Sequence, residues 1–418
     1  MLYDVLYNIA GKIVRLEGRK FLLLRKGAKP DFLIGPKPGQ ATALYIHIPF
    51  CKVLCSYCSF NRYPFEEDKV RSYFSHLRRE IDMYIDRGFR FSNVYIGGGT
   101  PTVIFDELSN LLEYLHKCFV IDSISLETNP GDITEESIRV LKDLGVKRLS
   151  MGVQSFNDNL LKEMGRLSHT GVEARRKAEL AQGKFDTFNI DILYNFPTQT
   201  YKMLRDDITT VKELGVDQVT FYPLMPARSI EGRIIKNIGT IDRGRERTFF
   251  NLIVDEFYRG GYKPSTVWCF SRGDRMIDEY IIDYSDYIAV GGGSVGLYNG
   301  HFYVNTFSLD RYNEMIDMGE LPIVMFRHLS GKEEMRYHLL TGLFSMSISD
   351  GRRFISYGFD LMREMSDEIA LLKLLGIVDG NGEGLTVRRR GMFFVSVMMR
   401  EFFTALNDLR EYCREKGI

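Results

Sequence analysis

The chain contains little cysteine or tryptophan and no excess of either charge. It has six cysteines and one tryptophan in 418 residues, and 55 Lys and Arg side chains balance 55 Asp and Glu side chains. So few cysteines in a chain of this length argue against a disulfide framework. A net charge of zero gives no general basic field for nucleic acid or an anionic membrane. The composition therefore disfavours disulfide-stapled secreted proteins and broadly basic nucleic-acid-binding proteins.

Long apolar runs and export signals are also missing. Met1–Ala10 contains an early acid, Asp4, and lacks the basic start and small-residue cleavage site of a signal peptide. No stretch approaches the roughly 18 uninterrupted apolar residues of a membrane-spanning helix. The sequence therefore predicts a cytoplasmic protein with reduced thiols and no membrane span.

Short β-branched or aromatic runs alternate with amphipathic segments through the first half of the chain. The predicted strands are Ala43–Ile48, Asn93–Ile96, Ser123–Thr128, Arg148–Gly152, Thr187–Leu193 and Gln218–Tyr222. The predicted helices are Lys69–Arg87, Phe105–Phe119, Thr134–Leu144, Asn157–Met164, Val172–Ala181 and Tyr201–Leu214. Such alternation is typical of parallel βαβ units. We therefore predict an α/β fold, a partial (β/α)6 barrel whose active site lies at the C-terminal ends of its strands.

The two ends of the chain differ from this pattern. Ile13–Lys26 alternates in part and predicts a small strand or hairpin, and Gly27–Gln40 has the Gly and Pro content of a linker. We expect an N-terminal extension over residues 1–40, the barrel over 41–305, and a smaller accessory α+β domain over 306–418 that covers the barrel mouth.

Within the predicted accessory domain, one stretch shows a helix followed by a turn and strands. Leu372–Val378 has a helical pattern, Gly380–Gly384 is a turn sequence, and Leu385–Gly391 follows it. This order predicts a helix, a turn and a small β-wing.

Three cysteines, Cys51, Cys55 and Cys58, form a C-x3-C-x2-C run after the first predicted barrel strand. A [4Fe–4S] cluster normally takes four Cys ligands, so a loop with three leaves one iron open to another ligand. A structural zinc site is the alternative, but it requires a fourth Cys or His nearby. His47 lies on the strand, where tetrahedral closure is awkward. The spacing favours the iron–sulfur cluster.

Candidate ligand-binding groups recur at the ends of the predicted strands. The glycines of Gly97–Pro101 allow a ligand to approach the backbone closely. Glu127 can bind ribose hydroxyls or pair with a helix N-terminus. Gln154 ends the next strand, and Arg166 can bind a carboxylate through its fork or form a surface ion pair. Asp191 is an acid within an apolar strand, which favours a ligand role.

Together these features resemble the radical S-adenosylmethionine (SAM) family of oxygen-independent coproporphyrinogen III oxidases and their relatives. The motifs that carry the resemblance are Tyr45–Cys51, Cys55–Cys58, Gly97–Thr102, Glu127–Pro130, Gly152–Ser155, Asn189–Pro197 and Gly291–Val295. The resemblance implies a [4Fe–4S] cluster whose open iron binds SAM, and reductive SAM cleavage to methionine and a 5′-deoxyadenosyl radical. It also implies an electron donor such as flavodoxin or ferredoxin, and anaerobic conditions.

The resemblance further implies two SAM molecules. By positional match, the residues around the SAM on the cluster are Tyr57, Gly99, Thr100, Gln154, Arg166, Asp191 and Pro223. Those bordering the second SAM are Tyr45, Gly98, Glu127 and Leu297. The backbone of Phe221–Pro226 is expected near an adenine. Tyr45 and His47 face one cavity at i and i+2 and are candidate proton-handling residues, while a core histidine held by the backbone is the alternative for His47.

Two departures from the family bear on the reaction. The oxidases have a fourth Cys two residues after the third, and here that position is Phe60. The related heme chaperones have a His-Asn-x-x-Tyr-Trp motif where this chain has Met276–Ile281, and the only tryptophan here is Trp268. Both departures favour the two-SAM branch, with methyl transfer to an sp2 carbon of an aromatic, heteroaromatic or tetrapyrrole substrate. The alternatives are coproporphyrinogen-type decarboxylation, anaerobic heme ring opening, and a heme-binding chaperone.

Overall fold

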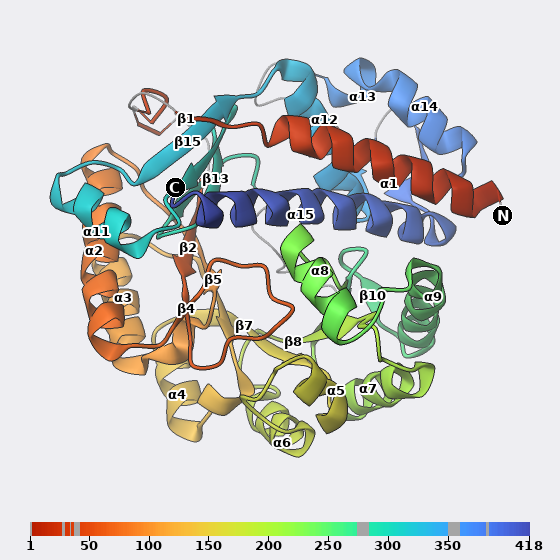
Figure 1. The fold of residues 1–418 in the computed structure, drawn as a ribbon, viewed down its shortest axis with the longest axis horizontal. Helices are drawn as coiled ribbons and strands as arrows, with labels where there is room; N and C mark the ends of the chain where they lie inside the picture. Colours follow the sequence, from red (N-terminus) through yellow and green to blue (C-terminus); the bar gives the residue numbers. More distant parts are fainter. Residues whose placement is uncertain are drawn as a thin grey trace.

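A computed structural model describes most of the chain (Figure 1). The described residues are 2–26, 30–33, 35–36, 42–273, 284–349, 360–381 and 384–418.

Six parallel strands form the centre of a mixed thirteen-stranded sheet. They are, in spatial order, β2 (Ala43–Ile48), β5 (Asn93–Gly98), β6 (Ser123–Thr128), β7 (Val146–Gln154), β8 (Thr187–Tyr194) and β9 (Gln218–Pro223). Most of their residues are buried, as expected for parallel strands that are covered on both faces. The predicted strands were therefore correct to within two residues at either end, and the predicted α/β barrel is confirmed.

The sheet continues beyond both edges of the parallel part. On one side β12 (Tyr287–Val290) pairs in parallel with β2, and antiparallel strands follow. These are β13 (Val295–Tyr298), β14 (His301–Asn305), β15 (Ile323–His328) and β1 (Arg25–Lys26). On the other side, β9 pairs with β11 (Cys269–Ser271), which pairs with β10 (Lys263–Pro264).

Helices surround the parallel strands, and α8 (Arg228–Asn237) among them lies next to α15 (Met392–Glu415) instead of on the outside (Figure 1). They are α2 (Glu67–Asp86), α3 (Phe105–Cys118), α4 (Glu135–Asp143), α5 (Asp158–Glu163), α6 (Gly171–Ala181), α7 (Tyr201–Leu214), α8 (Arg228–Asn237) and α9 (Arg243–Arg259). Thr134, Thr170 and Thr200 precede α4, α6 and α7, and each side chain accepts a hydrogen bond from the backbone N–H three residues later. These caps stabilise the first turn of each helix, and the three helices begin within one residue of the predicted start.

The N-terminal extension is a helix, so the predicted strand or hairpin over Ile13–Lys26 was wrong. Helix α1 (Leu2–Phe21) lies alongside α15 (Met392–Glu415), and only the two-residue strand β1 follows it (Figure 1). Gly18 allows the two helices to approach closely, since a Cβ there would lie 3.3 Å from Ala405 Cβ. The helix is thus fixed by a partner nearly 400 residues away in sequence, which local alternation does not reveal.

The C-terminal part joins helices to a small separate sheet. The elements are α11 (Leu309–Asp317), α12 (Gly331–Phe344), β16 (Ser347–Ser349), α13 (Leu361–Glu364), α14 (Ser366–Leu374), β17 (Val378–Asn381) and β18 (Gly384–Val387), followed by α15. Strands β17 and β18 follow α14 and pair as a small antiparallel wing, and β16, which precedes α13, pairs with β18. A helix followed by a β-wing is therefore present, but the predicted helix Leu372–Val378 was misplaced, because α14 ends at Leu374 and Val378 begins β17. β14 lies before the predicted domain boundary at residue 305, and β15 lies after it. Because the two strands pair with each other, the main sheet continues into the region predicted as the accessory domain.

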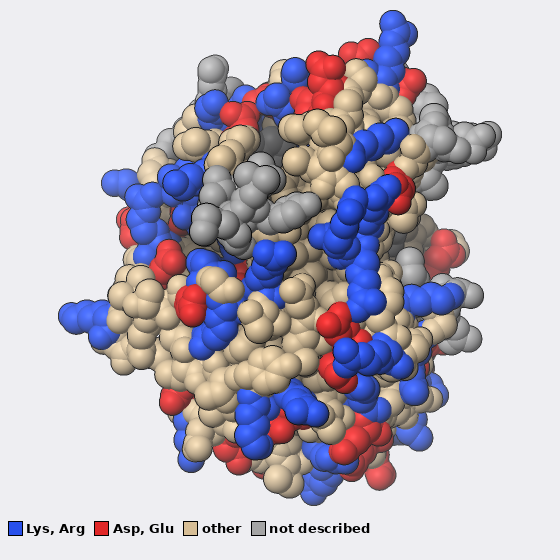
Figure 2. All heavy atoms as spheres, turned by 90° about the vertical axis from the view of Figure 1, so that its right-hand side faces the viewer, with Lys and Arg blue, Asp and Glu red and all other residues tan. Residues whose placement is uncertain are grey.

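The surface charge and the character of the helices can both be compared with the composition. Basic and acidic side chains are interspersed over the face shown in Figure 2. Among the helices of the described residues, none has both the length and the apolar character needed to cross a bilayer.

Candidate active site

The three cysteines lie on a loop that short strands and hydrogen bonds hold in place. Cys51 is on β3 (Phe50–Cys51), which pairs in parallel with β4 (Tyr63–Pro64), and the loop between these strands carries Cys55 and Cys58. Arg62 Nη2 donates to the backbone oxygens of Cys55 and Cys58 over 2.6 and 2.9 Å. All three cysteines have free thiols. The loop therefore presents three thiols on a fixed backbone.

Polar groups surround these thiols. Thr100 Oγ1 donates to Cys51 Sγ at 3.5 Å, and Arg166 Nη1 donates to Cys55 Sγ at 3.6 Å. Burial raises the pKa of the Cys51 thiol to about 11. Burial opposes the charge of Arg166, but Tyr57 and Cys55 outweigh it and raise the Arg166 pKa. A half-buried cation beside the thiols suits the negative charge of thiolate ligands.

The donor set fits an iron–sulfur cluster better than zinc. Among the described residues, no three His, Cys, Asp or Glu side chains are grouped to hold one metal ion. Structural zinc requires four ligands around a single ion, so the arrangement argues against that alternative. The thiolates of a [4Fe–4S] cluster bind separate iron atoms and need not converge on one point. The three thiols and the neighbouring cation remain compatible with such a cluster.

The glycine turn after β5 lies directly against the cysteine loop. A Cβ on Gly99 would be 2.6 Å from the backbone oxygen of Phe50, and one on Gly98 would be 2.6 Å from His47 Cε1. Gly98 also has a φ of +116°, in the region that favours glycine. Only glycine fits at these two positions, and the result is exposed backbone beside the cysteines.

Two acids on the central strands, Glu127 near the end of β6 and Asp191 within β8, line the same cavity. Glu127 accepts hydrogen bonds from Tyr95 Oη at 2.8 Å and from the Gly98 N–H at 3.1 Å. Burial, together with the negative charge of Asp191, raises the pKa of Glu127 to about 7. Asp191 accepts from Ser150 Oγ at 2.7 Å, and burial raises its pKa as well. Glu127 does not cap any helix of the described residues, which favours its predicted ligand role over the helix N-terminal one.

Arg166 is half-buried and does not form the surface ion pair considered from the sequence. Its Nη2 donates to the backbone oxygen of Gly152 and to Asn129 Oδ1. Nearby, Tyr222 Oη donates to Gln154 Oε1, and Gln154 has a φ of 74°, which is uncommon for a residue other than glycine. These contacts bring the ends of β7 and β9 together beside the cysteine loop.

One cavity of about 240 Å³ collects most of the predicted cofactor-binding residues. The predicted residues that line it are Tyr57, Cys58, Gly98, Gly99, Glu127, Gln154, Arg166, Asp191 and Pro223. Tyr222, Leu224 and Met225 also line it, so the segment predicted to lie near an adenine is part of the wall. The geometry thus brings together the cysteine loop, the glycine turn and the strand-end acids.

The cavity also has lining residues that the sequence analysis did not place there. They are Phe60, Trp268, Phe403, Asn407 and Arg410. The last three of these come from α15, where spacings of four and three residues put them on one face of the helix. Their spacing could have shown from the sequence that these three residues share one face of a helix. No motif in the sequence indicated that this face lies against the barrel.

The other predicted site residues lie outside the cavity lining. They are Tyr45, His47, Cys51, Cys55, Thr100 and Leu297. Leu297 is fully buried in the hydrophobic core on β13. The stretch Met276–Ile281, which replaces the heme-chaperone motif, lies outside the described residues.

His47 has both ring nitrogens engaged by the protein. Nδ1 is 2.9 Å from Tyr45 Oη, and Nε2 is 3.1 Å from the backbone oxygen of Asn61, which can only accept. The proton therefore lies on Nε2, and Nδ1 accepts from the tyrosine. Burial lowers the pKa of His47 to about 4, so the ring is neutral. These contacts favour the core-histidine alternative, and the catalytic roles of Tyr45 and His47 stay predictions.

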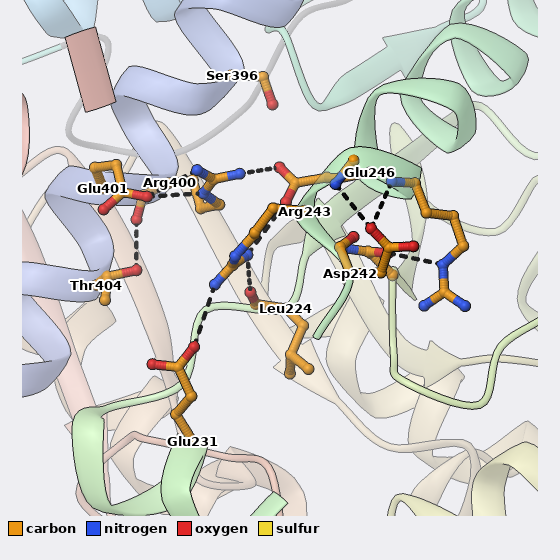
Figure 3. Close-up of polar contacts among 12 residues, drawn as sticks. Leu224, Glu231, Asp242, Arg243, Glu246, Ser396, Arg400, Glu401 and Thr404 are labelled. Atoms are coloured by element: carbon orange, nitrogen blue, oxygen red, sulfur yellow. Dashed lines mark hydrogen bonds and ion pairs between the residues drawn. The ribbon is translucent and has the colours of Figure 1, made fainter. Parts of the chain in front are cut away.

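A partly buried network of charges is hydrogen-bonded to the backbone of Leu224 in the cavity wall (Figure 3). Arg243 Nη1 donates to the backbone oxygen of Leu224 at 3.4 Å and to Glu246 Oε2 at 3.1 Å. Arg400 on α15 donates to Glu246 Oε1 at 2.5 Å and to Glu401 Oε1 at 2.7 Å. The network therefore fixes α9, α15 and the loop after β9 to one another.

Comparisons with known proteins agree with this geometry. Residues 45–231 match the family model described as the radical SAM superfamily. The chain is 31% identical over 288 residues to the heme chaperone HemW of Lactococcus lactis, which covers 66% of this chain and 74% of that protein. It is 27% identical to anaerobilin synthase of Escherichia coli O157:H7, covering 72% of this chain and 71% of that protein.

A solved structure shares the fold over nearly the whole length. Coproporphyrinogen III oxidase (HemN) from Escherichia coli superposes with a TM-score of 0.76 at 21% identity, covering 91% of this chain and 95% of that one. Together with the HemW match, the cysteine loop and the barrel, this shows that the chain belongs to the radical SAM superfamily, in the family of heme chaperones and oxygen-independent coproporphyrinogen III oxidases.

Proposed function

We propose that this radical SAM enzyme modifies a tetrapyrrole. The observation that carries the proposal is a cavity lined both by Cys58 and the glycine turn and by the aromatic side chains of Trp268 and Phe403. Flat aromatic walls suit a large planar substrate. Relatives named as a heme chaperone, an anaerobilin synthase and a coproporphyrinogen oxidase support the substrate class.

The chain's own residues suit the binding of a cluster and SAM. Cys51, Cys55 and Cys58 would hold a [4Fe–4S] cluster, which when bound supplies the electron for SAM cleavage and so a carbon radical able to abstract hydrogen. Glu127 and Asp191 would accept hydrogen bonds from hydroxyl or amino groups. We extend this to two SAM molecules, because these two acids lie on different strands that border the same cavity.

A first experiment tests cluster and substrate class. Anaerobic reconstitution should give about four irons per chain, and addition of heme or coproporphyrinogen III should raise the rate of 5′-deoxyadenosine release. The triple variant Cys51→Ala, Cys55→Ala and Cys58→Ala should lose both iron and release. Retention of SAM cleavage by that variant would contradict the cluster assignment. Stoichiometric heme binding and transfer without substrate-dependent release would favour the chaperone alternative.

Two candidate reactions are considered. The first is decarboxylation or ring opening of the tetrapyrrole without methyl transfer, and the second is methyl transfer to an sp2 carbon. Two named relatives, an anaerobilin synthase and a coproporphyrinogen III oxidase, support the first. Phe60 supports the second, because it stands in the cavity wall where the oxidases carry a fourth Cys.

Isotope labelling separates these two reactions. SAM with a deuterated methyl group should give deuterium-free 5′-deoxyadenosine if the radical takes hydrogen from the tetrapyrrole. Deuterium in 5′-deoxyadenosine, with equal amounts of S-adenosylhomocysteine and a product that contains CD2, would show methyl transfer instead.

A further inference from the structure

Arg62 is a cation that is bonded to the cysteine loop itself, four residues after Cys58. Its Nη2 donates to the backbone oxygen of Cys55 at 2.6 Å and to that of Cys58 at 2.9 Å. These two bonds hold the guanidinium beside two of the three cysteines that we assign to the cluster. The position of the charge is therefore fixed by the same backbone that carries the thiols.

The other two nitrogens of the Arg62 guanidinium have no protein partner. The residue is half-buried, but its Nε and Nη1 atoms are buried, and neither has a hydrogen-bond acceptor among the described residues. No acid in that part of the chain forms an ion pair with Arg62. Buried donors and charges are costly unless another group compensates them. A negatively charged cluster on the neighbouring thiolates would supply that compensation.

Arg62 differs from two other cations of this region. Arg166 donates directly to Cys55 Sγ and lines the cavity, whereas Arg62 does not line it. Lys52 is exposed and pairs with Asp132 at 3.1 Å. Arg62 is therefore placed to act on the thiols through its charge, and not by contact with SAM or a substrate in the cavity.

The Cys51 thiol lies within electrostatic reach of this charge. Burial raises the pKa of Cys51, the other two cysteines add to the rise, and Thr100 and Arg62 oppose it. A further cation, Arg414, is also close: burial lowers its pKa, Cys58 opposes that effect, and Arg62 adds to the lowering. Arg62 thus acts electrostatically on groups around the loop although no hydrogen bond joins it to a sulfur.

We infer that Arg62 raises the reduction potential of the cluster and so makes its one-electron reduction easier. Reduction adds one electron, and with it one negative charge, to a group that three thiolates already make more negative. A fixed cation nearby stabilises the reduced form more than the oxidised form, and charge and hydrogen bonding around the sulfurs are among the properties that set such potentials. Arg62 is thus a positioning residue for the cluster. The inference rests on the cluster assignment of the proposed function and is independent of the tetrapyrrole.

Redox titration of the reconstituted protein, without substrate, tests this inference. The unmodified protein, Arg62→Gln and Arg62→Lys are reduced stepwise with titanium(III) citrate and mediator dyes, and the EPR signal of the reduced cluster gives the midpoint potential. The first variant removes the charge but keeps a hydrogen-bond donor, and the second keeps the charge. Arg62→Gln should lower the ratio of reduced to oxidised cluster about tenfold at a fixed potential, which corresponds to about 59 mV for a one-electron couple. Arg62→Lys should change that ratio by less than about twofold.

Lys52→Met is the matched control. It removes an exposed cation directly after Cys51 and should leave the potential unchanged. An unchanged potential in Arg62→Gln would overturn the inference. An equal fall in Arg62→Gln and Arg62→Lys would also overturn it, because the geometry of the loop, and not the charge, would then be responsible.

Iron content keeps the test decisive if a variant assembles poorly. Should Arg62→Gln fail to hold about four irons per chain, the result for Arg62→Lys decides. An intact cluster with an unchanged potential supports the role of the charge, whereas lost iron or a lowered potential in Arg62→Lys overturns it. The iron content of the unmodified protein reports separately on the cluster assignment, so a failure of the proposed function is distinguishable from a failure of this inference.

Discussion

At the scale of single residues, Glu127 connects the ionisation of the site to cofactor binding. Its carboxylate accepts from Tyr95 and Gly98, and its pKa is raised to about 7, first by burial and then by Asp191. The ionised form is the better acceptor for ribose hydroxyls, so SAM affinity should increase as the pH rises from 6 to 8. Glu127→Gln should weaken binding roughly tenfold at pH 8 and remove the pH dependence. Equilibrium dialysis with labelled SAM measures both, and an equally steep pH profile in the variant would exclude Glu127 as its source.

Residues with a recognisable spacing were predictable, and those placed by tertiary contacts were not. Cys51, Cys55 and Cys58 share one loop, so their proximity follows from the chain alone. The convergence of Glu127 and Asp191 follows from parallel strands, whose carboxyl ends share one edge. Arg410 lies more than two hundred residues after Asp191 and enters the cavity only because α15 crosses the barrel. A helix face predicts which residues lie together, but it does not predict what they face.

At the scale of elements, the strands and helices of the barrel were predictable from the sequence and the N-terminal helix was not. The barrel elements show a regular spacing of apolar residues and helix-capping residues, both of which can be read from the sequence. Helix α1 contains Gly11 and Gly18, which have poor helix propensity and weaken any sequence-based helix prediction. In the structure both glycines face α15, where a side chain would crowd Val397 or Ala405. The two glycines that weaken a helix prediction for α1 are therefore the residues that allow α1 to pack closely against α15.

This packing gives a prediction for α1. Gly18→Leu should separate the two helices and lower the free energy of unfolding of this contact by about 1–3 kcal/mol, because overpacking forces backbone shifts. Limited proteolysis should then cleave faster within residues 1–41. Lys12→Leu introduces the same side chain at an exposed position of α1 and should leave the cleavage rate unchanged. Equal rates in Gly18→Leu and the unmodified protein would show that this contact does not hold α1 in place.

At the scale of the whole molecule, a few buried or half-buried charges connect α1 and α15 to the barrel. Arg400 of α15 bonds to Glu246 of α9, and Glu401 pairs with Arg15 of α1 at 2.5 Å. Arg243 extends the network to Leu224 in the cavity wall. The helix that carries Arg410 is therefore held to α9, to α1 and to the wall through one set of ion pairs. A change in this network should affect substrate binding as well as stability.

Removing Arg400 alone should lower the free energy of unfolding more than removing both Arg400 and Glu246. Arg400→Met leaves Glu246 buried with less compensation and should lower the free energy of unfolding by about 3 kcal/mol. Arg400→Met with Glu246→Leu removes both charges and should recover most of that loss, because apolar groups of similar size can replace a buried pair. Arg175→Met breaks exposed pairs with Glu179 and Glu213 and should lower the free energy of unfolding by less than about 1 kcal/mol. Denaturant unfolding of the three variants measures these differences. An additive loss in the double variant would show that the two charges act independently, and α15 would then be held to the barrel mainly by its apolar face.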